Sequence, residues 1–243
     1  MTRIFVAGAL GVIGKPLMRL LVAAGHDVTG TTRSVAKAAD LAKLGATPAV
    51  VDVFDADALK AAVVAAKPDV VIHQLTDLPD SSDPAAISKS LEANARIRIE
   101  GTYNLIVAAK SAGSRRFIAQ SIGFLYASKT LPHHEGDPIK PPGDVSARGV
   151  HALEGAVTGT PGIDGIVLRY GKLYGPGTWN EKTGDNKPDG TGYIHVDAAA
   201  QAALMAVTRG APGIYNVAED DGELDIGKAR GELGFDPGFR LKA

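Results

Sequence analysis

The sequence contains no cysteine, and this absence excludes several kinds of chemistry. The chain forms no disulfide, holds no metal through thiolates and carries no cysteine nucleophile. A second absence concerns charge of one sign. The 26 basic and 27 acidic residues are spread along the chain and give a net charge of −1. No basic stripe favours a nucleic-acid partner, and no cationic amphipathic segment favours a membrane surface.

Long hydrophobic runs are also missing. No apolar run approaches the length of a membrane span, and the start "MTRIFVAGA" lacks the positively charged leader of a targeting signal. We therefore expect a cytoplasmic protein with no membrane or nucleic-acid partner. Hydrophobic residues make up 45% of the 243 residues, which suffices for a well-buried core in one domain, alone or with a small appendage.

Short β-branched runs alternate with alanine-rich helical patterns along the chain. The patterns predict strands at residues 3–7, 26–32, 46–52, 68–75, 115–121 and 162–170, and helices at 12–24, 34–45, 55–66 and 84–113. This alternation is typical of parallel strands joined by right-handed crossovers. We expect an α/β fold, a Rossmann-type doubly wound parallel sheet with a small C-terminal substrate lobe.

The glycine loop and the family resemblance described below imply how the chain is divided. Residues 1–174 form a dinucleotide-binding domain in this interpretation, and residues 175–243 form a small substrate-side region that partly returns to it. Two segments rich in proline and glycine, 127–144 and 175–192, lie outside the regular elements. Irregular segments of this length in a compact domain usually belong to a site or to disorder.

A glycine-rich loop stands between the first strand and the first helix, in the stretch "FVAGALGVIGKPL". Gly8 permits a tight turn, Gly11 lets the backbone approach a pyrophosphate, and Gly14 allows close packing of helix on strand. The helix start, with Val12 and Ile13, offers free amides and a positive dipole to phosphates. A structural glycine turn is the alternative, but the strand before the loop and the helix after it favour dinucleotide binding.

The end of the second strand bears on the choice of cofactor. An NAD site usually places an acidic side chain there, whereas this chain has Thr32, Arg33 and Ser34. Arg33 is suited to a bidentate contact with a 2′-phosphate, and the two hydroxyls are further donors. A cation at a helix start is disfavoured by the helix dipole, which also indicates an anion. We expect NADP as the cofactor, with NAD as the alternative.

Motifs along nearly the whole chain resemble the extended or atypical branch of the short-chain dehydrogenase/reductase superfamily, which contains the NAD-dependent epimerase/dehydratases. Beside the glycine loop, these are "VVDVFD", "PDVVIHQLT", "EGTYNLIVAAKSAGSRRFIAQS", "VLRYGKLYGPG", "YIHVDAAAQAALMAV" and "KARGELGFDP". The resemblance implies cofactor contacts in the adenine-binding segment, at the ends of the fourth and fifth strands and in the sixth-strand signature. They fall on Asp52, Val53, Leu75, Thr76, Ser121 and Tyr170.

The catalytic part of the resemblance breaks down. The superfamily relies on a Tyr and a Lys four residues apart on one helix, and none of the six tyrosines here has Lys four residues later. On the helix "DVSARGVHALEGAV", the Tyr position falls at Ser146 and the Lys position at Val150. The remaining catalytic candidates are Ser121, at the end of the fifth strand, and Tyr126. The alternative for Tyr126 is a substrate-shaping aromatic residue.

Two function classes stay open on these grounds. The first is an NADP-binding epimerase/dehydratase-like oxidoreductase acting on a small carbonyl, alcohol or sugar-derived substrate. The second is a catalytically silent NADP-binding sensor or interaction protein, which the missing Tyr and Lys favour. The family's usual insertions before "IHV" and "KAR" are short here. Either the substrate lobe is minimal or residues are omitted, and the substrate itself does not follow from the sequence.

Two further features have competing interpretations. His133, His134 and Glu135 are contiguous, and adjacent residues rarely bind one ion well, so we expect no metal site. An apolar stripe lies on the long helix, at a position where family members pair across a homodimer. The stripe packs either against a second copy or against the chain's own sheet. Its members are Ile97, Gly101, Leu105 and Ala108.

Overall fold

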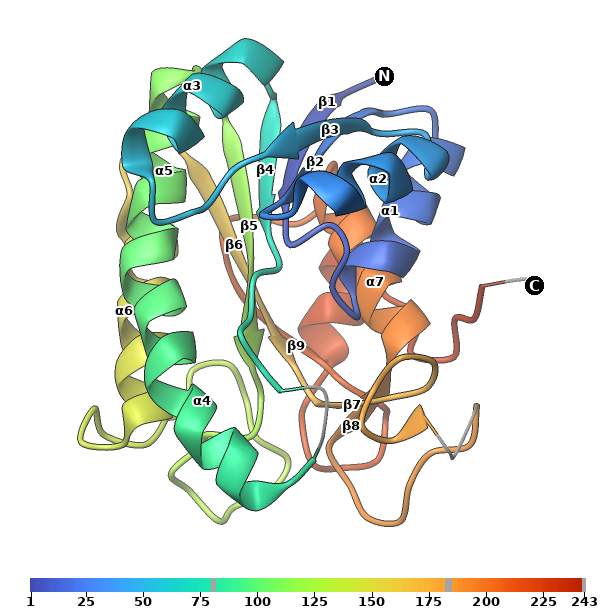
Figure 1. Cartoon of the computed structure of the whole chain (residues 1–243). Coiled ribbons are helices and arrows are strands. Elements are labelled where there is room, and N and C mark those ends of the chain that lie inside the picture. The colour runs from blue at the N-terminus through green and yellow to red at the C-terminus, as the bar shows by residue number, and fades with distance from the viewer. Residues whose placement is uncertain (80–81, 182–184, 242–243) are drawn as a thin grey trace.

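Seven parallel strands form one sheet in the order β3-β2-β1-β4-β5-β6-β9 (Figure 1). The computed structural model describes residues 1–79, 82–181 and 185–241. The strands of this sheet are β1 (Arg3–Ala7), β2 (Asp27–Thr32), β3 (Thr47–Val50), β4 (Val70–His73), β5 (Arg116–Ile122), β6 (Asp164–Tyr170) and β9 (Gly213–Val217). Two short strands, β7 (Lys172–Tyr174) and β8 (Tyr193–His195), pair separately in parallel.

Helices cover both faces of the sheet (Figure 1). They are α1 (Gly14–Ala23), α2 (Ala38–Lys43), α3 (Ala56–Ala66), α4 (Pro84–Arg96), α5 (Thr102–Ser111), α6 (Val145–Gly159) and α7 (Val196–Ala206). One apolar core joins α1 and α7 to the sheet, with Leu17 and Leu21 among its members. A second core joins α3, α5 and α6 to the other face, with Phe117 between them. The predicted Rossmann-type doubly wound fold is therefore confirmed.

The strand order reverses at β1, which pairs with β2 on one side and with β4 on the other. In open parallel sheets, ligands bind at such a switch point, outside the carboxyl ends of the strands. The glycine-rich loop follows β1 at this point. The topology thus places the loop beside the turns that follow β2 and β4.

The predicted elements are mostly present, with three differences. The helix expected at 84–113 contains α4, a wider π-helical turn at Ile97–Gly101, and α5. The sequence pattern gave six strands in the sheet, whereas β9 is a seventh that pairs with β6. β9 is only five residues long, so its alternating pattern is too short to stand out in the sequence. The short β7 and β8 were not expected either.

The stretch after residue 174 contributes to both sheets. β9 is part of the main sheet, α7 packs in the apolar core on one face of that sheet, and β8 pairs with β7. This arrangement is compatible with a substrate-side region that partly returns to the first domain. We keep the boundary between residues 174 and 175 as a proposal. Among the described residues, no helix has both the length and the apolar character to cross a membrane.

The apolar stripe of the long helix packs inside the chain. Leu105 and Ala108 belong to the core that covers one face of the sheet, Ile97 is buried, and Gly101 lies against Val53. Different residues form the exposed apolar stripe of this helix, at i, i+4 and i+8 spacing: Ile99, Tyr103 and Val107. A homodimer stays a prediction, and these three residues are where a partner helix would find an apolar surface.

Leu17 tests the core between α1 and the sheet. Its side chain is fully buried, so Leu17→Ala leaves a cavity and should lower the free energy of unfolding by about 2–5 kcal/mol. Urea denaturation followed by circular dichroism measures the change. Val35→Ala is the control, because Val35 is 78% exposed and its truncation should cost less than about 0.5 kcal/mol. Equal effects of the two substitutions would contradict the packing.

Candidate cofactor and active site

The glycine loop is closed tightly against its neighbours. Gly8 has φ +88°, and a Cβ there would lie 2.6 Å from the carbonyl of Gln74 at the end of β4. A Cβ at Gly14 would overlap the carbonyl oxygen of Gly8. The Gly11 amide donates to that same oxygen at 3.1 Å. Gly8 and Gly14 therefore have to be glycine, because a side chain at either position would collide with neighbouring backbone atoms.

The outer side of the loop is open. Gly11 is exposed, and a Cβ there would meet only the Gly8 oxygen, at 3.3 Å. Val12 is 39% exposed, whereas the side chain of Ile13 is buried in the core and leaves only its backbone for a ligand. The start of α1 has no side-chain cap and no acidic residue in its first turn. A bare helix start beside an open backbone is a fitting cradle for the pyrophosphate of a dinucleotide.

The turn after β2 carries the predicted 2′-phosphate contacts. The Thr32 hydroxyl accepts a hydrogen bond from the Ser34 amide at 3.1 Å, which shapes the turn. Arg33 reaches outward, with 64% of its side chain exposed, and one guanidinium nitrogen lies 3.6 Å from a carboxylate oxygen of Asp77. An ion pair this exposed contributes little to stability, so the guanidinium can exchange this partner for another anion.

The predicted adenine contacts lie at the neighbouring turns. Asp52 accepts a hydrogen bond from the Phe54 amide at 3.0 Å, and Val53 is buried. Leu75 and Thr76 are half-buried and follow β4 at the carboxyl edge of the sheet. The structure thus brings the predicted binding residues of three turns to one edge of the sheet. Their role in holding a cofactor stays a proposal.

A buried histidine anchors the end of β4. His73 Nδ1 accepts from the Leu75 amide at 3.2 Å, so the ring proton resides on Nε2, which donates to the Thr102 hydroxyl at 3.1 Å. Burial, with the nearby charge of Arg98, lowers the pKa of His73 to about 3. The ring is therefore neutral and ties the turn after β4 to the start of α5.

Beside it, a buried polar pair lies under the edge of the sheet. Gln74 Nε2 donates to the Tyr170 hydroxyl at 3.3 Å, and burial raises the pKa of that phenol. Gln74 Oε1 is buried and has no hydrogen-bond partner within the described part of the chain. Tyr170, a predicted cofactor contact, is itself only 2% exposed. The edge therefore retains an unused acceptor next to the predicted site.

At the two positions where the resemblance places the catalytic Lys and Tyr, this chain has Val150 and Ser146, which make other contacts. Val150 is fully buried on α6 and packs in an apolar cluster with Leu125 and Ala147. Ser146, one turn earlier, is half-buried. The place where the family carries an ammonium is thus closed by hydrocarbon, and no group there lowers the pKa of a phenol.

A buried charged network takes up this end of the sheet instead. Arg169 on β6 forms a two-pronged pair with Glu154 on α6, at 2.9 Å and 2.6 Å. The Ser121 hydroxyl on β5 donates to the same carboxylate at 2.7 Å. Arg169 also donates to the Tyr126 hydroxyl at 2.8 Å. Both catalytic candidates, Ser121 and Tyr126, therefore belong to one network around a buried ion pair.

Tyr126 is firmly held. Its hydroxyl donates to Asn216 on β9 at 2.6 Å, and its ring stacks on His133 with centroids 4.6 Å apart. Burial raises the pKa of this phenol, against the charge of Arg169, which lowers it. Sequence patterns did not reveal the Arg169–Glu154 pair. The available signal was two charged residues at positions whose neighbours are all apolar.

The contiguous histidines diverge in space. His134 pairs with Asp225 at 2.9 Å, and Glu135 accepts a hydrogen bond from the Asn216 amide at 2.9 Å. Within residues 1–79, 82–181 and 185–241, no group of three or more His, Asp or Glu side chains is arranged to hold a metal ion.

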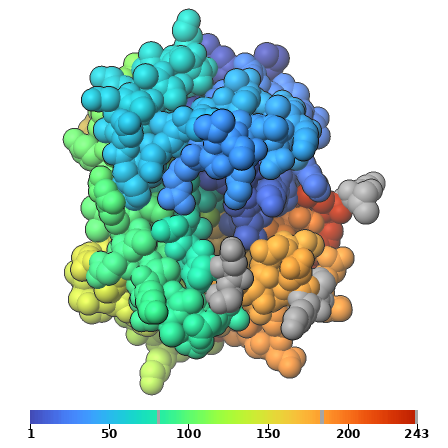
Figure 2. All heavy atoms as spheres, viewed as in Figure 1, coloured from blue at the N-terminus to red at the C-terminus, as the bar shows by residue number. Residues whose placement is uncertain are grey.

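Two segments flank the carboxyl edge of the sheet. The segment around α4 (green) and the segment around β7 and β8 (orange) lie at the same end of the molecule, below the glycine loop (Figures 1 and 2). They touch where the Trp179 indole donates to the carbonyl of Pro79 at 2.9 Å.

Comparison with known proteins decides the family. The model of the NAD dependent epimerase/dehydratase family matches residues 4–218. The chain belongs to this family. The predicted resemblance is thereby confirmed, and the chain is an epimerase/dehydratase-like oxidoreductase with a nicotinamide-dinucleotide site.

Individual proteins are similar to this chain in sequence or in fold. The chain is 39% identical over 241 residues to a 3-diazoavenalumate denitrifying reductase of a Streptomyces species, covering 90% of this chain and 76% of the relative. The fold resembles UDP-glucose 4-epimerase of Thermotoga maritima, solved with UDP-glucose, with a TM-score of 0.79, 20% identity, and 96% and 93% of the two chains covered. It also resembles dTDP-glucose 4,6-dehydratase of Streptomyces venezuelae, solved with NAD, with a TM-score of 0.76, 19% identity, and 97% and 92% covered.

His73 makes the stability of the fold depend on pH. Its pKa is about 3 in the folded chain against 6.5 for an unperturbed ring, so the unfolded chain binds a proton that the folded chain does not. The contribution of the neutral, buried ring to folding stability is fully present above pH 6.5 and is lost as the pH falls toward 3. As the pH falls from 7 to 5, the free energy of unfolding should therefore decrease by about 2 kcal/mol.

Urea denaturation of the wild type and of His73→Gln at the two pH values measures this difference. The variant should be less sensitive to pH, because Gln keeps a hydrogen-bonding side chain but does not titrate. Equal sensitivity in both proteins would show that His73 is not the buried neutral group.

Proposed function

We propose that the chain is an NADP-dependent oxidoreductase acting on a small carbonyl, alcohol or sugar-derived substrate. The observation that carries the choice of cofactor is Arg33, exposed after β2 where an NAD site usually has a carboxylate. When bound, the cofactor supplies or accepts a hydride. The chain itself provides the pyrophosphate cradle, the 2′-phosphate contacts at Thr32, Arg33 and Ser34, and the adenine contacts at Asp52 and Val53.

The proposed catalytic groups hold protons at two places. Ser121 Oγ, 2.7 Å from Glu154, can turn its hydrogen from the carboxylate to a substrate oxygen. Tyr126 has a phenol whose pKa is raised by burial, so it stays protonated and can donate its proton to a substrate oxygen. Arg169 pairs with Glu154, and through these contacts the two side chains position both hydroxyls. This set differs from the family's Tyr and Lys, which are Ser146 and Val150 here.

The direction of the reaction is inferred from a relative. The Streptomyces protein at 39% identity is named a reductase, which supports reduction by NADPH as the reaction to test first. The alternative is a catalytically silent NADP-binding sensor or interaction protein. The buried, fully bonded positions of Ser121 and Tyr126 and the apolar Val150 favour that alternative.

Turnover distinguishes the two functions. We expect purified protein to oxidise NADPH with at least one member of a panel of small aldehydes, ketones, keto-sugars and diazo-substituted aromatic acids. Tyr126→Phe keeps the stack on His133 but removes the donor, and should lower kcat about 10²-fold. Its affinity for NADPH should stay unchanged. No turnover with any substrate, despite micromolar NADPH binding, would refute the enzyme and favour the sensor.

Arg33 is tested separately from catalysis. Arg33→Ala should weaken NADP binding about tenfold or more and leave NAD binding unchanged, because a charge-assisted contact is lost only with the phosphate. Asp77→Asn is the matched variant, and we expect it to change the affinity for NADP in the opposite direction. It frees the guanidinium from its partner at 3.6 Å and should strengthen NADP binding. Fluorescence titration gives both affinities, and an unchanged NADP/NAD ratio in Arg33→Ala would refute the assignment.

A further inference from the structure

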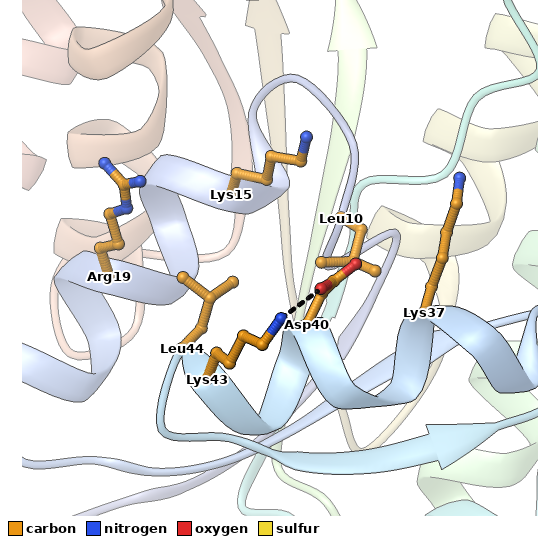
Figure 3. A pocket seen from close by; sticks show the side chains of 7 residues that line it. All are labelled: Leu10, Lys15, Arg19, Lys37, Asp40, Lys43 and Leu44. Carbon is orange, nitrogen blue, oxygen red and sulfur yellow. Dashed lines mark hydrogen bonds and ion pairs between the residues drawn. The ribbon is translucent and has the colours of Figure 1, made fainter.

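A cationic groove lies between α1 and α2 (Figure 3). Its volume is about 360 Å³. Lys15 and Arg19 border it from α1, while Lys37, Asp40 and Lys43 border it from the α2 side. Four cations against one carboxylate give the groove a net charge of +3, although the whole chain carries −1.

The positive charge in the groove is largely uncompensated. Lys15, Arg19 and Lys37 have no hydrogen bond or ion pair with any residue that the structure describes. Lys43 has one, a long contact of 3.5 Å to Asp40 (Figure 3). Both groups of that pair are well exposed, so it contributes little. The groove therefore offers cations that are available to a ligand.

The placement of these cations is unfavourable for the bare helix. Lys15 lies in the first turn of α1, where the positive end of the helix dipole disfavours a cation. Arg19 follows four residues later on the same side, where like charges repel. An anion in the groove removes both costs at once. The same cations at the other end of α1 would need no such ligand.

The rest of the lining indicates the kind of anion. Two leucines, Leu10 and Leu44, add apolar surface to the groove. A volume of about 360 Å³ exceeds that of a single ion and accommodates a diphosphate or a small phosphomonoester. We propose that the groove between α1 and α2 is a binding site for a multivalent phosphoryl anion, with its charge held by Lys15, Arg19, Lys37 and Lys43.

Two sources could supply such a group. Leu10 belongs to the glycine loop, so the groove begins beside the proposed pyrophosphate cradle. The phosphoryl group is then either the 2′-phosphate of NADP or part of a separate ligand. The site itself rests on the groove and its charges, and does not depend on turnover or on Arg33.

Calorimetric titration with inorganic pyrophosphate tests the site. NAD at saturation occupies the glycine loop under the proposed function, so binding that persists in its presence belongs to the groove. The double variant Arg19→Gln, Lys37→Gln removes one cation from each side and should weaken this binding about tenfold. Asp40→Asn should strengthen it. The double variant Lys60→Gln, Lys110→Gln removes two exposed cations elsewhere and should leave it unchanged.

The outcomes separate the sources and the hypotheses. Binding that survives NAD but is displaced by NADP assigns the groove to the 2′-phosphate, and binding that survives both assigns it to a separate ligand. The proposal is overturned if pyrophosphate binding is lost when NAD is added, or if all the charge variants bind pyrophosphate with equal affinity. If the chain binds neither NAD nor NADP, the cofactor proposal fails, while the charge variants still decide whether the groove binds phosphoryl anions.

Discussion

The buried ion pair of Arg169 and Glu154 is the constraint on which the active-site end of the molecule depends. Through it, β6 is joined to α6, and its side branches reach Ser121 on β5 and Tyr126 in the loop that follows. Tyr126 passes the connection on to Asn216 on β9. Each partner is stable in the interior only with the other, because an isolated buried charge costs several kcal/mol. Four elements, β5, β6, β9 and α6, are thus linked through one ion pair.

This network also accounts for how the chain differs from its family. Where the resemblance places an ammonium beside a phenol, α6 has hydrocarbon at Val150, and the positive charge beside the Tyr126 hydroxyl comes from Arg169 on β6. An arginine in a two-pronged pair loses less conformational freedom per hydrogen bond than a lysine, because its guanidinium fork is planar and pre-organised. Under the proposed function, the proton donors are Ser121 and Tyr126, and each already makes a hydrogen bond that a substrate would have to replace.

The sequence predicted those parts of the molecule that follow from local pattern. The strand, glycine loop and helix around Gly8 and Gly14 were readable because spacing and flanking periodicity agree. The absence of Lys four residues after every Tyr was equally plain. Long-range features were not readable: the pairing of Arg169 with Glu154 joins residues 15 apart on different elements. The stripe of Ile97 and Leu105 could face inward or outward, and only the packing of α5 on the sheet decides.

The loose pair between Arg33 and Asp77 has a consequence for how the chain distinguishes its cofactors. A carboxylate in place of Arg33 would repel a 2′-phosphate and so exclude NADP. Arg33 has no corresponding effect on NAD, because a ribose hydroxyl neither displaces Asp77 nor clashes with the guanidinium. Under the proposed function, Arg33 therefore raises the affinity for NADP through the 2′-phosphate, but does not lower the affinity for NAD. The ratio of the two cofactors in the surroundings, as much as the protein, would set which one occupies the site.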